Sequence, residues 1–255
     1  MKNNFSLPAL AWVILTAICL VLLIVGLHKA LIATNRDKKY QKKIIIRTIV
    51  SLLTWTGLLL FLSYNNFFLE FSKLPPRPAL PILLPLPFVL LIAFSRKGTQ
   101  LLQAVPSHWM VWMQSFRIIV ELLLLNAFVR GDIPVQMTFE GRNMDIITGV
   151  LALPVGFIVA RGKTYSTKVA VAFNIIGILL LANILVIALL SMPTPIRYFM
   201  NEPANTLVAR FPFILLPGVL VPIAYSLHIF SLRQLLTLHS AGRRQRRVKN
   251  MGVAA

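Results

Sequence analysis

Cysteine, acidic residues and catalytic signatures are nearly absent from this sequence. Its 255 residues include one cysteine, Cys19, and only seven aspartates and glutamates. A single cysteine excludes a disulfide framework and a multi-cysteine metal site within one chain. The sequence also lacks a Walker loop, a Gly-x-Ser-x-Gly motif and a His-Glu-x-x-His motif. These absences remove the usual signatures of nucleotide hydrolases, serine hydrolases and zinc peptidases.

Charge is also scarce, and apolar residues take its place. Charged residues make up 13% of the chain, whereas a soluble domain carries roughly 25%. Hydrophobic residues make up 57% and gather in long runs, and runs of roughly 20 apolar residues are typical of membrane-crossing helices. We expect an all-α, polytopic bundle forming one integral membrane domain, residues 1–255, with a basic tail at 233–255. The seven expected spans are Leu10–Ile32, Ile44–Tyr64, Ala79–Phe94, Trp109–Val129, Met144–Ala160, Val169–Ser191 and Phe213–Leu232.

Two of these runs are shorter than a full crossing and contain proline. The third run holds Pro81, Pro85 and Pro87, and the fifth holds Pro154. Proline lacks a backbone donor and frees a carbonyl that neighbouring helices or water must satisfy. We therefore expect broken or kinked helices at both places. For the third run, length alone does not establish a full crossing.

The charges of the loops supply evidence for this crossing. If all seven runs cross, most of the 26 basic residues fall on one side of the membrane, with Asp37 the only acid there. Basic residues accumulate on the cytoplasmic side of membrane proteins. The N-terminus is therefore expected outside and the C-terminus in the cytoplasm. A third run that did not cross would invert this bias for every later span.

Arg117 and Glu121 lie one helical turn apart near the middle of the fourth expected span. A charge inside a bilayer is costly, so an ionisable residue at that depth is a functional-site hypothesis. Side chains four residues apart share a helix face and can form an ion pair. One interpretation is a structural pair that locks the span against its neighbours. The other is a polar cavity where Glu121 takes up a proton or a cation and Arg117 meets an anion.

The loop after this span adds a second cluster of polar residues. Gly141 suits a turn, Asn143 suits a helix cap, and Asp145 suits the positive end of the fifth helix. Glu140 and Arg142 have no such structural role, and both are expected above Glu121. The sequence thus predicts a ligand site open to the extracytoplasmic side, made from Arg117, Glu121, Glu140, Arg142, Asn143 and Asp145.

The same stretch resembles the signature of an uncharacterised family of bacterial multi-pass membrane proteins. The matching residues are Phe116-Arg117, Val120-Glu121, Ile133-Pro134, Met137-Thr-Phe-Glu-Gly-Arg-Asn143, Asp145 and Gly149. The resemblance covers about 35 residues well and the rest of the chain only by hydropathy. It implies a location in the bacterial cytoplasmic, or inner, membrane and supplies no activity.

Three histidines near the cytoplasmic ends of spans raise a haem alternative. His28, His108 and His228 are expected at similar depth, and histidines on facing helices can ligate a b-type haem. Histidines at the membrane interface explain the same positions without a cofactor. We expect no cofactor and no metal.

The tail after the last span is strongly basic, with the run Arg243-Arg-Gln-Arg-Arg-Val-Lys249. Such a run fixes topology and attracts anionic lipid. Binding to nucleic acid would require a folded basic domain, so no nucleic-acid partner is expected. Nothing in the sequence specifies an oligomeric state.

Three functions remain open on these grounds. The leading one is a transporter or ligand-binding protein, whose ligand is small and polar or anionic and whose site lies between the fourth and fifth spans. The first alternative is a non-catalytic scaffold or partner subunit in which Arg117 and Glu121 form a structural ion pair. The second is a membrane enzyme acting on a lipid-linked substrate, with Glu121 or Glu140 as general base.

Overall fold

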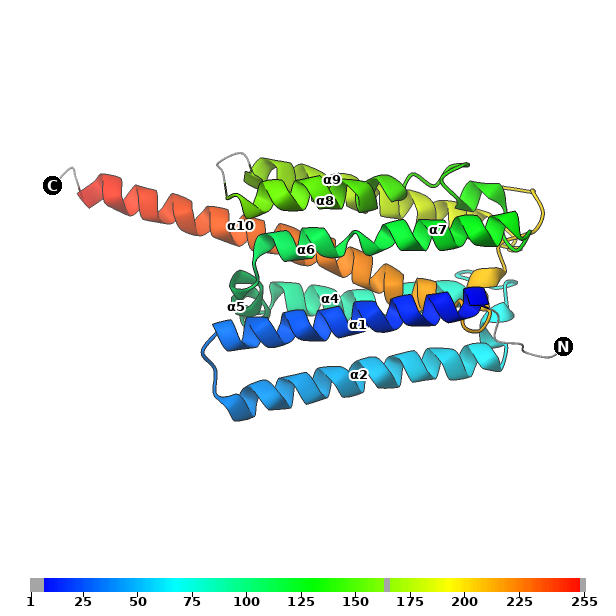
Figure 1. Cartoon of the computed structure of the whole chain (residues 1–255), viewed down its shortest axis with the longest axis horizontal. Coiled ribbons are helices and arrows are strands. Elements are labelled where there is room, and N and C mark those ends of the chain that lie inside the picture. Colours follow the sequence, from blue (N-terminus) through cyan, green and yellow to red (C-terminus); the bar gives the residue numbers. More distant parts are fainter. Residues whose placement is uncertain (1–6, 163–165, 253–255) are drawn as a thin grey trace.

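The computed structural model describes residues 7–162 and 166–252, and side chains as far as residue 237. Every regular element within these ranges is helical, which confirms the predicted all-α class. Figure 1 shows the long helices lying side by side, with the last helix extending past one end of the bundle.

Six helical segments are long and apolar enough to cross a membrane. The first two, α1 (Leu7–Ala33) and α2 (Lys38–Tyr64), are joined by a short turn and pack against each other. The other four segments are Arg77–Phe94, Ser107–Val129, Ser166–Leu190 and Leu216–Thr237. These six correspond to six of the seven predicted spans, and the fifth predicted span is the exception.

Turns divide several of these segments. The proline-rich third segment is broken at Leu84, as its prolines predict. The remaining helices are α3 (Leu80–Leu83), α4 (Pro85–Phe94), α5 (Arg96–Ala104), α6 (Ser107–Met113), α7 (Phe116–Val129), α8 (Ile146–Ala160), α9 (Ser166–Leu190) and α10 (Val221–Gly252). Short 3-10 turns occupy Phe67–Leu69, Arg77–Ala79, Val135–Met137 and Leu207–Ala209, and a π-helical turn, Leu216–Leu220, leads into α10.

The fourth span, predicted as one unbroken helix, is interrupted just before Arg117. The backbone N–H groups of Arg117 and Ile118 donate to the carbonyls of Gln114 and Ser115, three residues back, at 3.1 Å each. Bonds to the third residue back wind the chain more tightly than an α-helix. This turn separates α6 from α7. No proline or glycine marks it, so the sequence carries no signal for the break.

Helix α8 has 15 residues, which is fewer than a full crossing needs. It begins beside the middle of the α6–α7 segment. Trp112 on α6 donates its indole N–H to the carbonyl of Leu153 at 3.3 Å. Nearer the start of α8, a Cβ on Gly149 would lie only 2.8 Å from the backbone nitrogen of Ile118. Therefore α8 runs antiparallel to α6 and the first turn of α7, and it starts near the level of Arg117.

The chain before α8 is mostly irregular and contacts α7. Residues 131–145 contain one 3-10 turn and otherwise follow an irregular path. Their backbone bonds to the end of α7 at Ala127, and Gln136, Thr138 and Asn143 are buried. Irregular backbone at membrane depth is tolerated where protein surrounds it. The predicted fifth span, Met144–Ala160, corresponds to α8, which is shorter than the six candidate spans. We refer to residues 131–145 and α8 together as the fifth layer.

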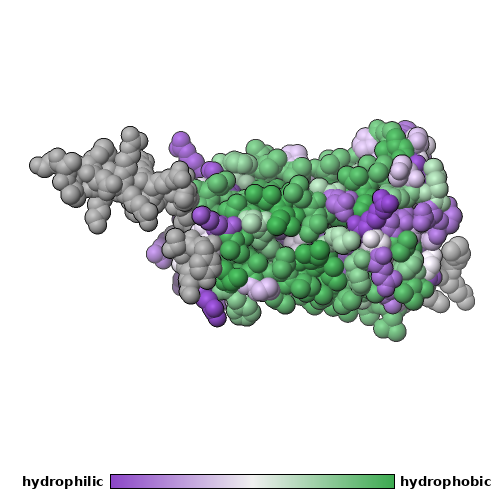
Figure 2. All heavy atoms as spheres, turned by 90° about the horizontal axis from the view of Figure 1, so that it is seen from above, coloured by the Kyte–Doolittle hydropathy of each residue, from purple (hydrophilic) through white to green (hydrophobic). Residues whose placement is uncertain are grey.

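Helix α10 lies at the centre of the bundle. Its apolar part is the most buried of the six candidate spans, whereas that of α2 is the least buried. It packs against α4, α5, α6 and α9. Figure 2 shows one face of the molecule, which is apolar across its middle and carries hydrophilic residues toward its ends. This distribution suits a protein surrounded by lipid.

Candidate functional site

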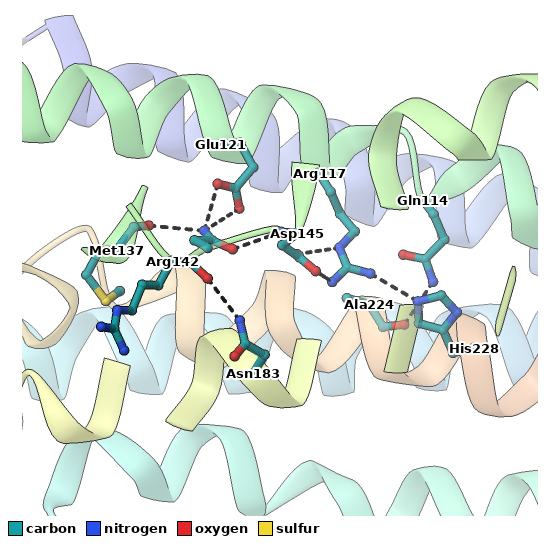
Figure 3. A network of polar contacts seen from close by, with 10 residues as sticks. Gln114, Arg117, Glu121, Met137, Arg142, Asp145, Asn183, Ala224 and His228 are labelled. Atoms are coloured by element: carbon teal, nitrogen blue, oxygen red, sulfur yellow. Dashed lines mark hydrogen bonds and ion pairs between the residues drawn. The ribbon is translucent and has the colours of Figure 1, made fainter. Parts of the chain in front are cut away.

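Arg117 is buried in the first turn of α7, with 2% of its surface exposed. Its Nε donates to Oδ2 of Asp145 at 2.6 Å, and its Nη2 contacts Oδ1 of the same carboxylate. The remaining nitrogen, Nη1, lies 3.0 Å from Nε2 of His228 on α10. Figure 3 shows the guanidinium between these two side chains. Every nitrogen of the Arg117 side chain is therefore engaged within the protein.

The predicted ion pair between Arg117 and Glu121 is wrong, because the carboxylate that pairs with Arg117 is that of Asp145. Helix α8 begins beside the first turn of α7, which brings Asp145 opposite the guanidinium. A planar guanidinium binds a carboxylate best through two parallel N–H groups. Asp145 meets this geometry from the facing chain, and Glu121 is bound by another residue.

Glu121 is 1% exposed, and the amide of Asn143 is its hydrogen-bond partner. Nδ2 of Asn143 lies 2.8 Å and 2.7 Å from the two carboxylate oxygens of Glu121 and 3.0 Å from the carbonyl of Met137. The amide oxygen of Asn143 accepts the backbone N–H of Asp145 at 3.0 Å. Asn143 thus links Glu121 to the start of α8, but the N-cap residue of that helix is Asp145 and not Asn143 as the sequence predicts. Among the described side chains, Glu121 has no ion-pair partner within 4.0 Å.

The network continues through His228 into α9. Nδ1 of His228 lies 2.9 Å from Oδ1 of Asn174, whose Nδ2 donates to the hydroxyl of Ser231 at 2.9 Å. Because Arg117 can only donate, Nε2 of His228 accepts and Nδ1 donates, which is the neutral form of the ring. Gly177 allows this close approach, since a Cβ there would lie 2.3 Å from Cε1 of His228.

The three histidines of the haem alternative lie in different surroundings, and His228 is the one that belongs to the network. It is fully buried in the bundle, and both of its ring nitrogens are engaged. His28 is exposed on α1, and His108 packs against Trp109 and Trp112 on α6. Across the described residues, no three His, Cys, Asp or Glu side chains gather as metal ligands would.

A cavity of about 70 Å³ lies beside the network. Its charged lining residues are Arg117, Glu121 and Asp145, and all its other lining residues are apolar. The apolar walls come from α3, α7, α9, α10 and the chain that leads into α10. They include Phe116, Leu124, Leu181, Ile184, Leu220 and Ala224. The cavity can therefore hold a small apolar group with Glu121 at one wall.

Glu140 and Arg142 lie outside this cluster. Both are exposed, and the guanidinium of Arg142 lies 5.2 Å from the ring centre of Phe199. The backbone carbonyl of Arg142 accepts a hydrogen bond from Asn183 on α9. Of the six predicted site residues, the structure brings four together and leaves these two at the surface.

Sequence reasoning missed three members of the network, His228, Asn174 and Ser231. One signal was present: His228 and Ser231 are three residues apart, which places both on one face of the last span. An amide in the preceding span, Asn174, is the complementary partner for that face. Their connection to Arg117 depends on which helices are neighbours, which hydropathy does not reveal.

Comparison with known families identifies this region. Residues 78–236 match the family described as a domain of unknown function, DUF8737, and the chain belongs to that family. The match extends from the third segment into α10 and so contains the whole polar network. This agrees with the predicted membership of an uncharacterised family, while the bacterial origin stays a prediction. Neither the curated proteins nor the solved structures include a significant match.

Proposed function

We propose that this DUF8737 protein is a transporter or ligand-binding protein of the bacterial cytoplasmic membrane. Its ligand is a small, mainly apolar molecule that carries one cationic group, and Glu121 binds that group. The observation that carries the proposal is the position of Glu121. Its carboxyl lines an apolar cavity, and its hydrogen-bond partner there is the neutral amide of Asn143.

The charges around the cavity favour a cation over the anion that the sequence suggests. Asp145 neutralises Arg117, whose remaining nitrogen is bonded to His228. An anion would have to displace Asp145 to reach the guanidinium. With both carboxyl groups ionised, Arg117, Asp145 and Glu121 together carry one net negative charge. A buried charge is stabilised by a partner of opposite sign, and a cationic ligand supplies one.

Transport, as opposed to binding alone, is supported by the broken elements beside the cavity. Residues 131–145 are irregular, α8 begins mid-bundle, and α6 is separated from α7 directly before Arg117. Discontinuous helices near the membrane midplane line the substrate sites of many transporters. Phe116 and Arg117, directly after the α6–α7 break, line the cavity together with Met137 and Asp145 of the irregular segment, so movement at either place would change its access.

The proposed topology has seven crossings, with residues 131–145 and α8 together forming the fifth. The N-terminus lies outside, and the basic turn between α1 and α2 and the basic tail lie in the cytoplasm. This places the basic side chains Arg36, Lys38, Lys39, Lys42 and Lys43 against the cytoplasmic leaflet. Anionic lipid at this surface is the proposed membrane partner, since each basic residue near the surface adds to that attraction.

A scaffold is the second candidate, and a specific observation favours it. All three nitrogens of Arg117 are bonded inside the protein, so the network connects α7, α8 and α10 whether or not a ligand binds. In a scaffold, Glu121 would serve the same packing role through Asn143. The lipid-enzyme alternative gains less support, because Glu140, one of its two candidate bases, lies outside the cavity and the other acid beside Glu121, Asp145, is paired with Arg117.

The charge class of the ligand can be tested with four-carbon probes. Purified protein is heated in detergent with n-butylammonium, n-butanol or butyrate, and unfolding is followed by tryptophan fluorescence. A ligand that binds the folded state raises the melting temperature with its concentration. We expect stabilisation by butylammonium, a smaller effect of butanol and none of butyrate. Equal effects of all three probes, or none, would reject the proposed site in favour of the scaffold.

A cavity-filling variant shows whether these probes enter the cavity. Ala188 on α9 lines it, whereas Ala182, two turns earlier on the same helix, is exposed. Ala188→Leu should abolish the stabilisation by butylammonium, and Ala182→Leu should leave it unchanged. If Ala188→Leu still responds as the wild type does, the probe binds elsewhere and the cavity is not the site.

A further inference from the structure

A second hollow lies beside the first half of α9, whereas the cavity lies beside its second half. It is a groove of about 240 Å³ between α8 and α9. Thr148, Phe173 and Gly177 are buried along its floor, and Leu151 and Ile176 form exposed walls. From Thr148 to Val155 the groove follows α8 for about 10 Å. That is roughly a third of the hydrocarbon thickness of a bilayer.

The surroundings of this groove are apolar and exposed. Val150 on α8 and Ile175 and Leu179 on α9 are between 48% and 63% exposed. An apolar surface of this kind in a membrane protein contacts lipid chains. The groove lies on this face, so its natural occupant is part of a lipid hydrocarbon chain.

One end of the groove carries positive charge. Arg161 directly follows α8, about 9 Å beyond Val155 along the helix direction, and Lys168 precedes Val169 on α9. Both side chains are exposed, and neither forms an ion pair with another described residue. The other end closes near the level of Arg117, in the middle of the bundle. A chain entering from the charged end would therefore reach about the midplane, which is the depth of one lipid leaflet.

We propose that the α8–α9 groove is a binding site for one anionic phospholipid of the leaflet at the basic end of the bundle. One acyl chain occupies the groove, and the phosphate contacts Arg161 and Lys168. Basic residues between transmembrane helices are known to bind anionic lipid headgroups. The site is separate from the Glu121 cavity and does not depend on the function proposed for it.

Native mass spectrometry tests the site directly. Purified protein is equilibrated with equal amounts of phosphatidylglycerol and phosphatidylcholine that carry the same chains, and the bound lipid is counted. We expect a preference for phosphatidylglycerol of at least about fivefold, the effect of one basic residue near the surface. Arg161→Gln with Lys168→Gln should abolish the preference. Lys73→Gln with Arg210→Gln removes the same charge from two exposed residues of the opposite end of the bundle and should keep it.

The groove itself is tested by a bulky side chain at its exposed edge. Ala172 lines the groove and is exposed, and Ala182 is exposed on the same helix away from it. Ala172→Phe should reduce bound lipid of both kinds severalfold, and Ala182→Phe should not. Glu121→Gln should bind lipid as the wild type does, which separates this site from the proposed function. Unchanged lipid preference in the Arg161–Lys168 double variant, or unchanged binding in Ala172→Phe, would overturn the proposal.

Discussion

The positive charge of Arg117 lies in the middle of the bundle, and three polar side chains stabilise it there. Asp145 binds it through two contacts, His228 accepts from its third nitrogen, and Asn174 holds His228 in turn. Removing one partner from a buried pair leaves an uncompensated charge and costs about 3–5 kcal/mol. The stability of this region therefore depends on the match between Arg117 and Asp145 more than on either residue alone.

A double-variant comparison identifies the carboxylate that pairs with Arg117. Arg117→Met should destabilise the protein by about 3–5 kcal/mol, because Asp145 then stays buried without its partner. Adding Asp145→Asn should recover much of that loss, while adding Glu121→Gln should recover less. The free energy of unfolding is measured by titrating denaturing detergent into mixed micelles. Equal recovery by the two second substitutions would contradict the assigned pair.

Gly177 supplies a prediction about packing against His228. An added Cβ would lie 2.3 Å from the imidazole, and overpacking of this kind costs typically about 1–3 kcal/mol. Gly177→Ala should therefore lower the free energy of unfolding by that amount, despite the better helix propensity of alanine. Gly57→Ala is the matched control, because nothing lies within 4 Å of its added Cβ. It should be neutral or stabilising, and a similar loss in both variants would argue against the tight contact at His228.

The sequence identified Arg117, Glu121, Asn143 and Asp145 correctly as members of one cluster, since polar residues stand out in an apolar chain. It paired the charges wrongly. The four-residue spacing on one helix suggested Glu121 as the partner of Arg117. The actual partner, Asp145, comes from a later part of the sequence and reaches Arg117 because α8 begins beside the first turn of α7. Glu140 lies close in sequence to the cluster, but the turn at Gly141 leaves it at the surface.

At the scale of elements, the segment 131–145 determines the shape of the site. It fills the space beside the second half of α7 that a longer α8 would otherwise occupy. Asn143 fastens this segment to Glu121, and Gln136 fastens it to Ser191 at the end of α9 through a 3.1 Å hydrogen bond. Few backbone hydrogen bonds hold an irregular segment, so these side-chain contacts set its stability.

Removing the Asn143 contact should loosen this segment selectively. Asn143→Ala leaves the Glu121 carboxyl buried without its partner, which costs about 1–3 kcal/mol. Hydrogen–deuterium exchange read by mass spectrometry should then quicken in residues 131–145 and stay slow in the middle of α8. The control is Asn183→Ala, which removes an exposed bond to the carbonyl of Arg142. Uniform exchange across both regions in Asn143→Ala would mean that Asn143 does not secure the segment.

Hydropathy located the helices well and their interruptions less well. The prolines of the third segment predicted its break, because proline removes a backbone donor in a known place. The turn at Gln114 and Ser115 had no such marker. The late start of α8 was hidden as well, since Met144 and Asp145 resemble an ordinary helix start and only the contacts with Trp112 and Ile118 reveal how deep that start lies.

For the molecule as a whole, the proposed topology follows from where its basic residues gather and from counting the fifth layer as a crossing. Six long helices alone would place both termini on one side. If the 15-residue α8 and the irregular segment before it cross as well, the number of crossings is odd and the termini lie on opposite sides. Whether Glu140 and Thr167 lie on opposite sides of the membrane therefore depends on this one layer.

Cysteine labelling tests the topology. The single native cysteine, Cys19, is buried, so a Cys19→Ser background offers no reactive thiol. In that background, Ser72→Cys and Glu140→Cys should react with a membrane-impermeant maleimide on intact spheroplasts. Asp37→Cys and Thr167→Cys should react only after the membrane is opened. Labelling of Glu140 and Thr167 from the same side would show that the fifth layer does not cross.

The central claim is that Glu121 binds the cationic group of a ligand inside the apolar cavity, and the affinity of n-butylammonium for three matched proteins tests it most directly. Equilibrium dialysis of the wild type, Glu121→Gln and Glu140→Gln provides the three dissociation constants. Glutamine keeps the shape of Glu121, and its amide oxygen still accepts from Asn143, whereas its NH2 group cannot accept. The substitution therefore removes the charge and one of the two contacts with Asn143. We expect Glu121→Gln to weaken binding at least about tenfold, a loss of roughly 1.4 kcal/mol, and Glu140→Gln to bind as the wild type does. Equal affinities for the wild type and Glu121→Gln would contradict the claim.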